Sequence, residues 1–171
     1  MAEDELVEQV APDGTVEAVV TRAEMRAGGL RHRCVYLLVV HDGRLLVHRR
    51  ADHKDIWPGR WDVAAGGVVG AGEAWDVAAR RELAEELGID AEVEPVGEGA
   101  WEGDEAKVLG RVYVVDHPGP FAFDDGEVVE ARFVDGVELD DLLARDEWCP
   151  DSVAVALPSV VDRLRRPGTS T

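Results

Sequence analysis

The chain has 171 residues, of which 46% are hydrophobic, and this length and composition are typical of a globular domain with its own core. Acidic residues outnumber basic ones by 36 to 18, so the formal charge is −18, which excludes nucleic acid as the expected partner. The longest apolar run, Cys34 to Val40, is too short to cross a membrane, and the acidic N-terminus does not have the apolar stretch of a secretory signal.

The first half of the chain predicts strands that lead into a glycine-rich loop and a helix. Residues 41–43, His-Asp-Gly, are typical of a tight turn, so the strands on either side of them are expected to form a hairpin. A helix is predicted over residues 74–87, with Gly88 in the place of its C-terminal cap. The strands predicted before this helix are residues 11–22 (entered through a turn), 33–40, 44–49 and 61–67, the last of which runs into the glycine loop.

The second half predicts further strands and then helices. Helices are expected over residues 137–145 and 153–164, with Pro158 starting or kinking the second one, and residues 166–171 are expected to form a frayed tail. The strands predicted here are 91–101, 107–116 and, after a loop over 116–127, 131–134. This order predicts an α/β (α+β) fold, in which a mixed β-sheet is sandwiched between helices in a single domain over residues 1–171.

Three acidic residues, Glu82, Glu85 and Glu86, crowd one face of the predicted helix 74–87 near its C-terminal end. The helix dipole disfavours carboxylates there, and the three also repel one another at helical spacings of three and four residues. A divalent cation with oxygen ligands, Mg²⁺ or Mn²⁺, removes this repulsion. The glycine loop before the helix allows a main-chain carbonyl to approach the same ion. The alternative is a solvated acidic helix face without a ligand.

The same stretch resembles the Nudix box, G-x5-E-x7-R-E-U-x-E-E-x-G-U, where U is an aliphatic residue. The match extends over residues 67–89 and preserves every spacing of the motif. The matching residues are Gly67, Glu73, Arg81, Glu82, Leu83, Glu85, Glu86, Gly88 and Ile89. Residues 5–135 are also similar, more loosely, to the branch of this superfamily that contains isopentenyl-diphosphate isomerase and its hydrolase-like, MutT-like bacterial relatives. The resemblance implies a Nudix fold over the whole domain.

The resemblance implies roles for the residues of the box. Glu82, Glu85 and Glu86 are expected to bind Mg²⁺ or Mn²⁺, together with the main-chain carbonyl of Gly66 or Gly67. Arg81 is expected to point away from the metal face and to orient the loop acid Glu73 through an ion pair.

A general base is expected to take the proton from the metal-bound water. Some family members use a glutamate of a later loop, and Glu127 lies at the matching distance of six residues before Phe133. Glu130 is the rival for this role, and Glu85 of the box is the third candidate. The alternative for Glu127 and Glu130 is that both are exposed loop acids without a catalytic role.

Arg49, Arg50 and Lys54 form a local basic cluster in a chain that has few bases. Cations before the box are suited to holding a diphosphate, with arginine giving two hydrogen bonds at once. The alternative is a basic strand end that pairs with neighbouring acids.

The aromatic and sulfur-containing residues carry weaker predictions. Trp57, Trp61 and Trp101 either stack on a substrate or pack in the core. His32 is interpreted as structural, although in the isomerases a histidine at this place binds metal, because its partner ligands are missing here. Cys34 is interpreted as a small buried residue.

The intact box favours a metal-dependent hydrolase that cleaves a phosphoanhydride bond in a nucleoside diphosphate linked to another group, or in a related diphosphate. An isopentenyl-diphosphate-isomerase-like enzyme is the first alternative, but the isomerases need a cysteine just before the box, where this chain has Ala64 and Ala65. A non-catalytic nucleotide-sensing module is the second alternative, for which a broken box is expected. The expected partner is a small-molecule diphosphate, without nucleic acid or membrane. The protein is expected to be cytoplasmic, and a homodimer is left open.

Overall fold

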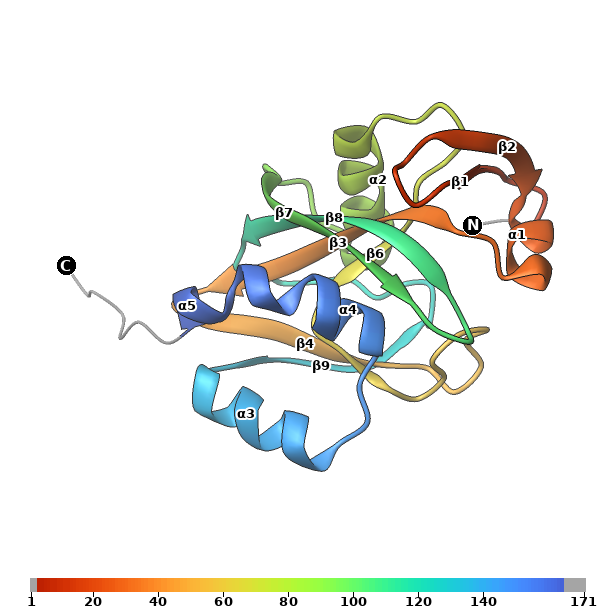
Figure 1. Ribbon diagram of the computed structural model, residues 1–171. Coiled ribbons are helices and arrows are strands. Elements are labelled where there is room, and N and C mark those ends of the chain that lie inside the picture. The colour runs from red at the N-terminus through yellow and green to blue at the C-terminus, as the bar shows by residue number, and fades with distance from the viewer. Residues whose placement is uncertain (1–2, 165–171) are drawn as a thin grey trace.

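The computed structural model describes residues 3–164, and its central strand is β3 (His32–His41). Within these residues the main sheet has seven strands and is mixed, because β3 pairs in parallel with β8 while the remaining pairs are antiparallel (Figure 1). The other strands are β4 (Arg44–Arg50), β5 (Trp61–Asp62), β6 (Ala65–Val68), β7 (Glu94–Glu102), β8 (Lys107–Asp116) and β9 (Val128–Val134).

The predicted hairpin of β3 and β4 is confirmed, but the two strands separate soon after their turn. They pair only at Val40–Leu45 and His41–Arg44, and beyond these positions β6 pairs with β3 while β5 pairs with β4. The strand predicted over residues 61–67 is therefore two short strands, which lie on opposite sides of this divergence. The separation leaves room for a cavity between the two arms of the sheet.

The helix predicted over residues 74–87 is confirmed as α2 (Trp75–Leu87). It ends where Gly88 adopts a φ of 65° and donates its N–H to the carbonyl of Ala84 at 3.1 Å. Glycine reaches this left-handed conformation at little cost, so Gly88 forms the predicted C-terminal cap. The cap fixes where the acidic last turns of α2 lie relative to the glycine loop.

The N-terminal segment contains more structure than the single strand predicted over residues 11–22. β1 (Leu6–Val10) and β2 (Val16–Thr21) form a separate antiparallel pair, and α1 (Arg22–Gly28) follows directly. Thr21 caps α1 by accepting from the N–H of Glu24, whose side chain accepts from the N–H of Thr21 in return.

The N-terminal segment is attached to the glycine loop that precedes α2. Val7 and Met25 are buried against Val68, and the N–H of Ala71 donates to the carbonyl of Leu6 at 2.8 Å. In Figure 1, β1, β2 and α1 accordingly lie together at one end of the molecule, next to the loop that enters α2. Residues distant from the box in sequence are thereby brought beside it.

The C-terminal part confirms one predicted helix and corrects another. α3 (Gly136–Arg145) matches the helix predicted over residues 137–145. The single helix predicted over residues 153–164 is wrong, because the chain forms α4 (Pro150–Val155), a 3₁₀ turn over residues 157–159 and α5 (Val161–Leu164). Pro158 lies in that turn and has no N–H with which to continue a helix. The predicted tail, residues 166–171, lies outside the described residues.

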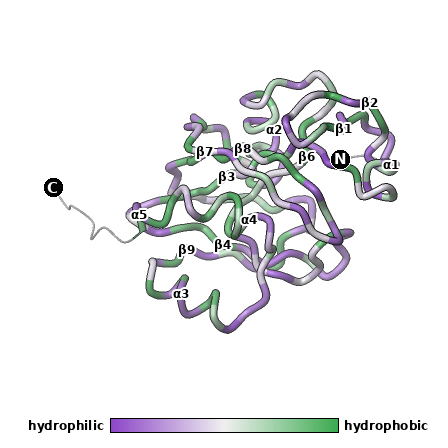
Figure 2. The backbone as a smooth tube through the Cα atoms, in the orientation of Figure 1, coloured by the Kyte–Doolittle hydropathy of each residue, from purple (hydrophilic) through white to green (hydrophobic). Residues whose placement is uncertain are grey.

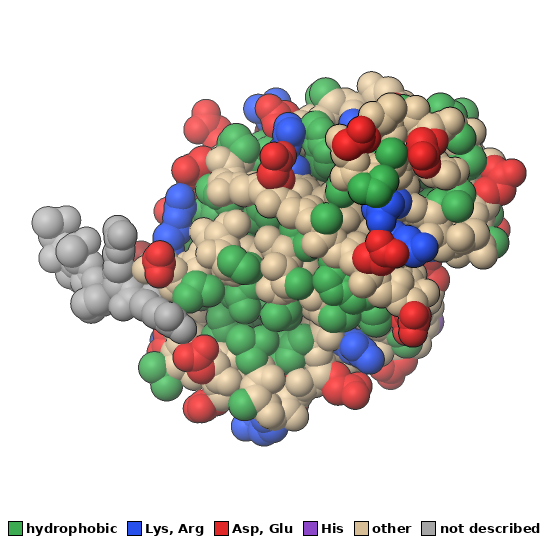
Figure 3. Space-filling view, viewed as in Figure 1, with side chains coloured by type: hydrophobic (Ala, Val, Ile, Leu, Met, Phe, Trp, Pro, Cys, Tyr) green, Lys and Arg blue, Asp and Glu red, His purple; other side chains and the backbone are tan. Residues whose placement is uncertain are grey.

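Alternate residues of β3 build two hydrophobic cores, one on each face of the sheet. Val35, Leu37 and Val39 pack in the core that α2 covers, and Tyr36 and Leu38 pack in the core that α3 and α4 cover. Figure 2 shows hydrophobic residues along the strands in the middle of the molecule. Figure 3 shows hydrophobic side chains in the area between α3 and α4, with charged side chains around them. The predicted mixed sheet between helices is confirmed.

Candidate active site

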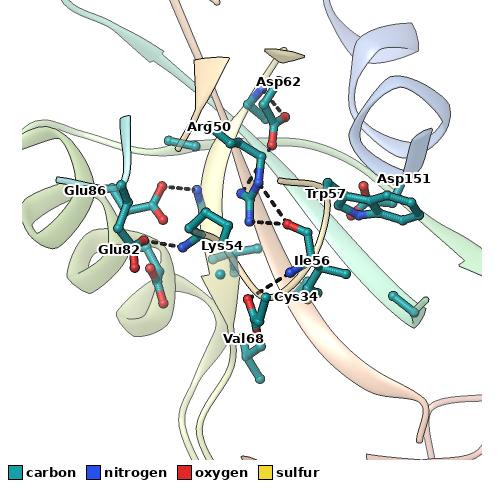
Figure 4. Close-up of a pocket in the computed structure, with 18 of the residues that line it drawn as sticks. Cys34, Arg50, Lys54, Ile56, Trp57, Asp62, Val68, Glu82, Glu86 and Asp151 are labelled. Carbon is teal, nitrogen blue, oxygen red and sulfur yellow. Dashed lines mark hydrogen bonds and ion pairs between the residues drawn. The ribbon is translucent and has the colours of Figure 1, made fainter. Parts of the chain in front are cut away.

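A cavity of about 800 Å³ opens where β3 and β4 diverge, and it is bordered by α2, the glycine loop and the segment after β4. Figure 4 shows Glu82 and Glu86 reaching from α2 toward Lys54, with Trp57 and Asp151 at another side of the cavity. The charged residues that line it are Glu3, Arg22, Arg26, Arg50, Lys54, Asp55, Asp62, Glu82, Glu85, Glu86, Asp124, Asp125, Glu127 and Asp151.

Two glycines before α2 allow the carboxylates of this helix to approach the backbone. A Cβ on Gly67 would lie 2.6 Å from Oε1 of Glu82, and a Cβ on Gly66 would lie 2.0 Å from the carbonyl oxygen of Val35. The N–H of Gly66 donates to Oε2 of Glu86 at 3.0 Å. A Cβ at Gly66 would push β6 away from β3, and a Cβ at Gly67 would force the carboxylate of Glu82 to shift, so the two glycines let β6 lie close both to β3 and to Glu82.

Burial and mutual repulsion raise the pKa of two of these carboxylates. Glu82 is only 6% exposed, and its pKa is raised by burial, against the lowering effect of Arg81. Burial and then the charge of Glu82 raise the pKa of Glu86 to about 8. Glu85 lines the same cavity from an exposed position. A positive charge placed between Glu82 and Glu86 would relieve the energetic cost that these shifts express.

Arg81 pairs with Glu73, as the box resemblance implies, but it does not point away from the acidic face. Its guanidinium donates to both carboxylate oxygens of Glu73 at 2.8 and 2.9 Å, and Glu73 in turn accepts from the N–H of Gly70 at 2.8 Å. It also donates to Glu82 at 2.7 Å and to Glu85 at 3.3 Å. A single arginine therefore connects the glycine loop to the acidic turns of α2.

The donor set suits a hard divalent cation, although the side chains would have to rearrange to share one. Within residues 3–164, no three histidine, cysteine, aspartate or glutamate side chains are grouped closely enough to hold an ion together. The reason is that Glu82 and Glu85 are turned toward Arg81, while Glu86 is turned toward the N–H of Gly66. Rotation off Arg81 would free the carboxylates of Glu82 and Glu85, and these with Glu86 are the oxygen donors that Mg²⁺ and Mn²⁺ prefer.

Glu127 lies in the cavity, and Glu130 does not. Glu127 forms an ion pair with Lys54, whose side chain is 13% exposed. Burial raises the pKa of Glu127, but the hydrogen bond and charge of Lys54 outweigh it, so the pKa is lowered overall. Glu130 is exposed and pairs opposite Arg49, because β9 begins at Val128, three residues earlier than predicted. The interpretation of Glu130 as a loop acid is therefore wrong.

Only two of the three residues in the predicted basic cluster line the cavity. Lys54 and Arg50 line the cavity, whereas Arg49 does not and instead lies 3.6 Å from Asp52. Neighbouring residues of a strand face opposite sides, so β4 directs only one of its two last arginines into the cavity. Arg50 donates to the carbonyl of Ile56 at 3.0 and 3.3 Å, which holds the segment after β4 in place. The prediction that Arg49 binds substrate is not supported by this position.

The aromatic candidates divide between the cavity and the core. Trp57 lines the cavity and meets the edge of Trp101, with ring centroids 5.7 Å apart. Trp61 belongs to the core beside Trp148, and Trp101 packs against the same core. Of the three tryptophans, Trp57 is the one placed to touch a ligand.

His32 and Cys34 both line the cavity, and both side chains are uncharged at neutral pH. His32 is buried, its Nδ1 lies 2.9 Å from the carbonyl oxygen of Leu30, and burial lowers its pKa to about 4. Burial raises the pKa of Cys34 to about 12, so its thiol stays protonated at neutral pH. Cys34 is half-buried and lines the cavity, so the prediction of a small buried residue holds only in part.

Several cavity residues were not predicted from the sequence. Arg22 and Arg26 come from α1, an unpredicted helix, and Asp55 comes from the segment after β4. Tyr36 donates its hydroxyl to Asp151 at 2.8 Å, and Asp151 lies near the start of α4. The spacing of Arg22 and Arg26, one helical turn apart after the capping pattern of Thr21 and Glu24, is the signal that would have found the first pair.

Comparison with known proteins identifies the family. The model of the NUDIX domain matches residues 30–154. The chain is 41% identical over 162 residues to an uncharacterized Nudix hydrolase of Escherichia coli strain K12, YfcD, covering 92% of this chain and 88% of that protein. It is 36% identical over 157 residues to an uncharacterized Nudix hydrolase of Streptomyces coelicolor, SCO1686, covering 88% and 86% respectively.

Solved structures show the same fold at lower sequence identity. The crystal structure of DR0079 from Deinococcus radiodurans superposes with a TM-score of 0.75 at 23% identity, covering 95% of this chain and all of that one. The MutT protein of Methanosarcina mazei superposes with a TM-score of 0.61 at 24% identity, covering 80% and 91%. Among residues 3–164, no helix has the length and apolar character needed to span a bilayer.

Proposed function

The chain belongs to the Nudix family and is a Nudix hydrolase, and on this premise we propose that it uses Mg²⁺ or Mn²⁺ to cleave a phosphoanhydride bond in a small diphosphate. The substrate class is a nucleoside diphosphate linked to another group, or a related diphosphate. The observation that carries the proposal is the pair of adjacent carboxylates, Glu82 and Glu86, in a cavity that Lys54 and Glu127 also line. The membership of the isopentenyl-diphosphate-isomerase-like branch stays a prediction.

The acidic turns of α2 would hold the ion. Glu82 and Glu86 are the main ligands in this proposal, with Glu85 and the carbonyl of Gly66 completing the protein side. A divalent cation at this place supplies the charge that acidifies a bound water and offsets the charge on the diphosphate oxygens. Arg81 would hold Glu73 and the glycine loop beside these ligands through its hydrogen bonds to Glu73 and to the carbonyl of Val68, which do not involve the metal-binding carboxylates.

Lys54 and Glu127 would act together on the substrate. Their ion pair places a cation and a potential base at one edge of the cavity. A diphosphate that draws Lys54 toward its oxygens frees the carboxylate of Glu127, and loss of that neighbouring charge raises the basicity of Glu127. Glu127 then accepts the proton of the attacking water. Arg50 holds the segment that carries Lys54 through the carbonyl of Ile56.

The chemistry of the cavity does not favour double-bond isomerisation. Ala64 and Ala65 stand where the isomerases have their cysteine, and both line the cavity. Cys34 does line the cavity, but desolvation of its thiol by the surrounding protein raises its pKa to about 12. Incubation with isopentenyl diphosphate and Mg²⁺ is therefore expected to yield no dimethylallyl diphosphate. Formation of that product at an enzymatic rate would reverse the order of the two proposals.

A substrate screen with Mg²⁺ and with Mn²⁺ tests the proposed function. The panel holds nucleotide sugars, dinucleoside polyphosphates, nucleoside and deoxynucleoside triphosphates, coenzyme A and prenyl diphosphates. We expect metal-dependent release of a phosphate or monophosphate product from at least one class, abolished by EDTA and strongly reduced by Glu82→Gln. No turnover of any class with either metal, or turnover that Glu82→Gln leaves unchanged, would contradict the proposal.

A further inference from the structure

Two arginines lie in the corner of the cavity next to α1, in a molecule whose formal charge is −18. Arg22 and Arg26 lie one helical turn apart on α1 and both line the cavity. Their side chains are only 19% and 23% exposed. Neither arginine belongs to the residues 30–154 that match the NUDIX domain, so this corner is an addition to the part of the chain that the family model describes.

The two arginines are incompletely paired. Asp55 is the partner that both share, and its Oδ2 lies 3.4 Å from Nε of Arg26 and 3.9 Å from Nη2 of Arg22. Among the described residues, Nε of Arg26 is buried and has no hydrogen-bond partner. Burial, the largest effect, lowers the pKa of Arg26. A buried guanidinium N–H without a hydrogen-bond acceptor is costly, so Asp55 alone does not satisfy the guanidinium of Arg26, and an anion in the cavity would offer this guanidinium further acceptors.

The position of α1 is fixed well enough to make this corner a defined site. The Thr21–Glu24 capping box sets the start of the helix, and Met25, between the two arginines, is buried against Val7 and Val68. Arg26, Cys34 and Glu82 line the same cavity, so the arginines of α1 and the acidic turns of α2 face one space. A ligand that reaches the acidic turns would therefore share this cavity with the arginines.

From these contacts we propose that Arg22 and Arg26 form an anion subsite that binds a phosphate group of the substrate other than the phosphate attacked by water. That the bound anion is part of the substrate rests on the proposed function. That an anion binds at this place rests on the two arginines alone. Asp55 occupies the arginines when no anion is present and competes with the anion. Arginine is suited to this role because its planar fork binds two phosphate oxygens at once.

Calorimetric titration with inorganic phosphate in EDTA, at low ionic strength, tests the subsite without any hydrolysis. Arg22→Gln and Arg26→Gln should each weaken phosphate binding about tenfold or more, because each removes a charge-assisted hydrogen bond. Asp55→Asn should strengthen binding, because it removes the competing carboxylate. Arg80→Gln is the matched control, since Arg80 is exposed on α2 outside the cavity lining, and should bind as the wild type does.

The opposite signs of these variants separate the proposal from a structural role. If the arginines only held Asp55 in place, Arg22→Gln and Asp55→Asn would lower thermal stability together and leave phosphate affinity at the wild-type value, which would overturn the proposal. Arg22→Gln provides the answer if Arg26→Gln does not fold. Phosphate binding that the arginine variants lose, in a protein that hydrolyses nothing in the screen, would support the subsite and contradict only the proposed function.

Discussion

Glu127 and Lys54 are the pair of residues on which the proposed chemistry depends most. The structure places both in the cavity and keeps Glu130 outside it. Glu127→Gln preserves the shape of the side chain and removes its basicity, so kcat should fall by about 10²–10⁴ with little change in KM. Glu130→Gln is the matched control and should stay near the wild type. Steady-state kinetics on the best substrate of the screen measure kcat and KM of both variants. A kcat of Glu127→Gln equal to that of the wild type would assign the role of general base to Glu85 instead.

His32 makes a separate prediction about stability and pH. Its pKa is about 4 in the folded protein because of burial, against an ordinary value of 6.5. Between these pH values the unfolded chain binds a proton that the folded chain does not, so stability is complete above pH 6.5 and is lost as the pH falls toward 4. The shift corresponds to about 3 kcal/mol in the free energy of unfolding.

Urea unfolding at pH 7 and at pH 4.5 measures this contribution. The wild type should lose more stability than His32→Gln between the two pH values, because glutamine has no proton to bind. Exposed His53→Gln is the control and should follow the wild type. Parallel losses in wild type and His32→Gln would mean that His32 takes up its proton in the folded state.

At the scale of elements, the packing of β6 against β3 depends on Gly66. A Cβ at Gly66, whose φ is 142°, would meet the carbonyl oxygen of Val35 at 2.0 Å. Gly66→Ala should therefore force β6 away from β3 and lower the free energy of unfolding by about 3 kcal/mol or more. Gly72→Ala is the control, because Gly72 has a φ of 71° but open space around it, and should cost only about 1 kcal/mol. Urea unfolding measures the free energy of unfolding of both variants. Equal losses in Gly66→Ala and Gly72→Ala would show that the positive φ, and not the clash with Val35, determines the cost.

The elements also show which structural features can be predicted from the sequence and which cannot. Spacing alone located α2, its cap at Gly88 and its acidic turns, because the Nudix box is a local pattern over residues 67–89 that includes the whole of this helix. Arg49 and Arg50 could not be separated in the same way, since the strand before them is buried on both faces and gives no alternation from which to read direction. The helix expected over residues 153–164 failed because hydrophobic spacing continues through Pro158 while the backbone cannot. Arg81 was misplaced because the rotamer of a long side chain depends on tertiary partners.

At the scale of the whole molecule, acidic residues dominate both the chain and the lining of the cavity. Arg22, Arg26, Arg50 and Lys54 are the basic residues that line it, beside ten acidic residues. The acidic surface disfavours nucleic acid, and the local cations, together with a bound divalent ion, would allow a small diphosphate to enter. The N-terminal strands and α1 complete this arrangement, which sequence reasoning from the box alone could not foresee.

The central claim is that the acidic turns of α2 bind a divalent cation, and thermal unfolding with and without Mg²⁺ tests it most directly. Without metal, Glu86→Gln should unfold at the same temperature as the wild type or higher, because it removes a half-buried carboxyl whose pKa is raised to about 8. At Mg²⁺ about 100-fold above its dissociation constant, the wild type should gain about 5–10 °C. Glu86→Gln should gain little, and exposed Glu92→Gln should behave as the wild type does. An equal gain in the wild type and in Glu86→Gln would contradict the assignment of the metal to this helix.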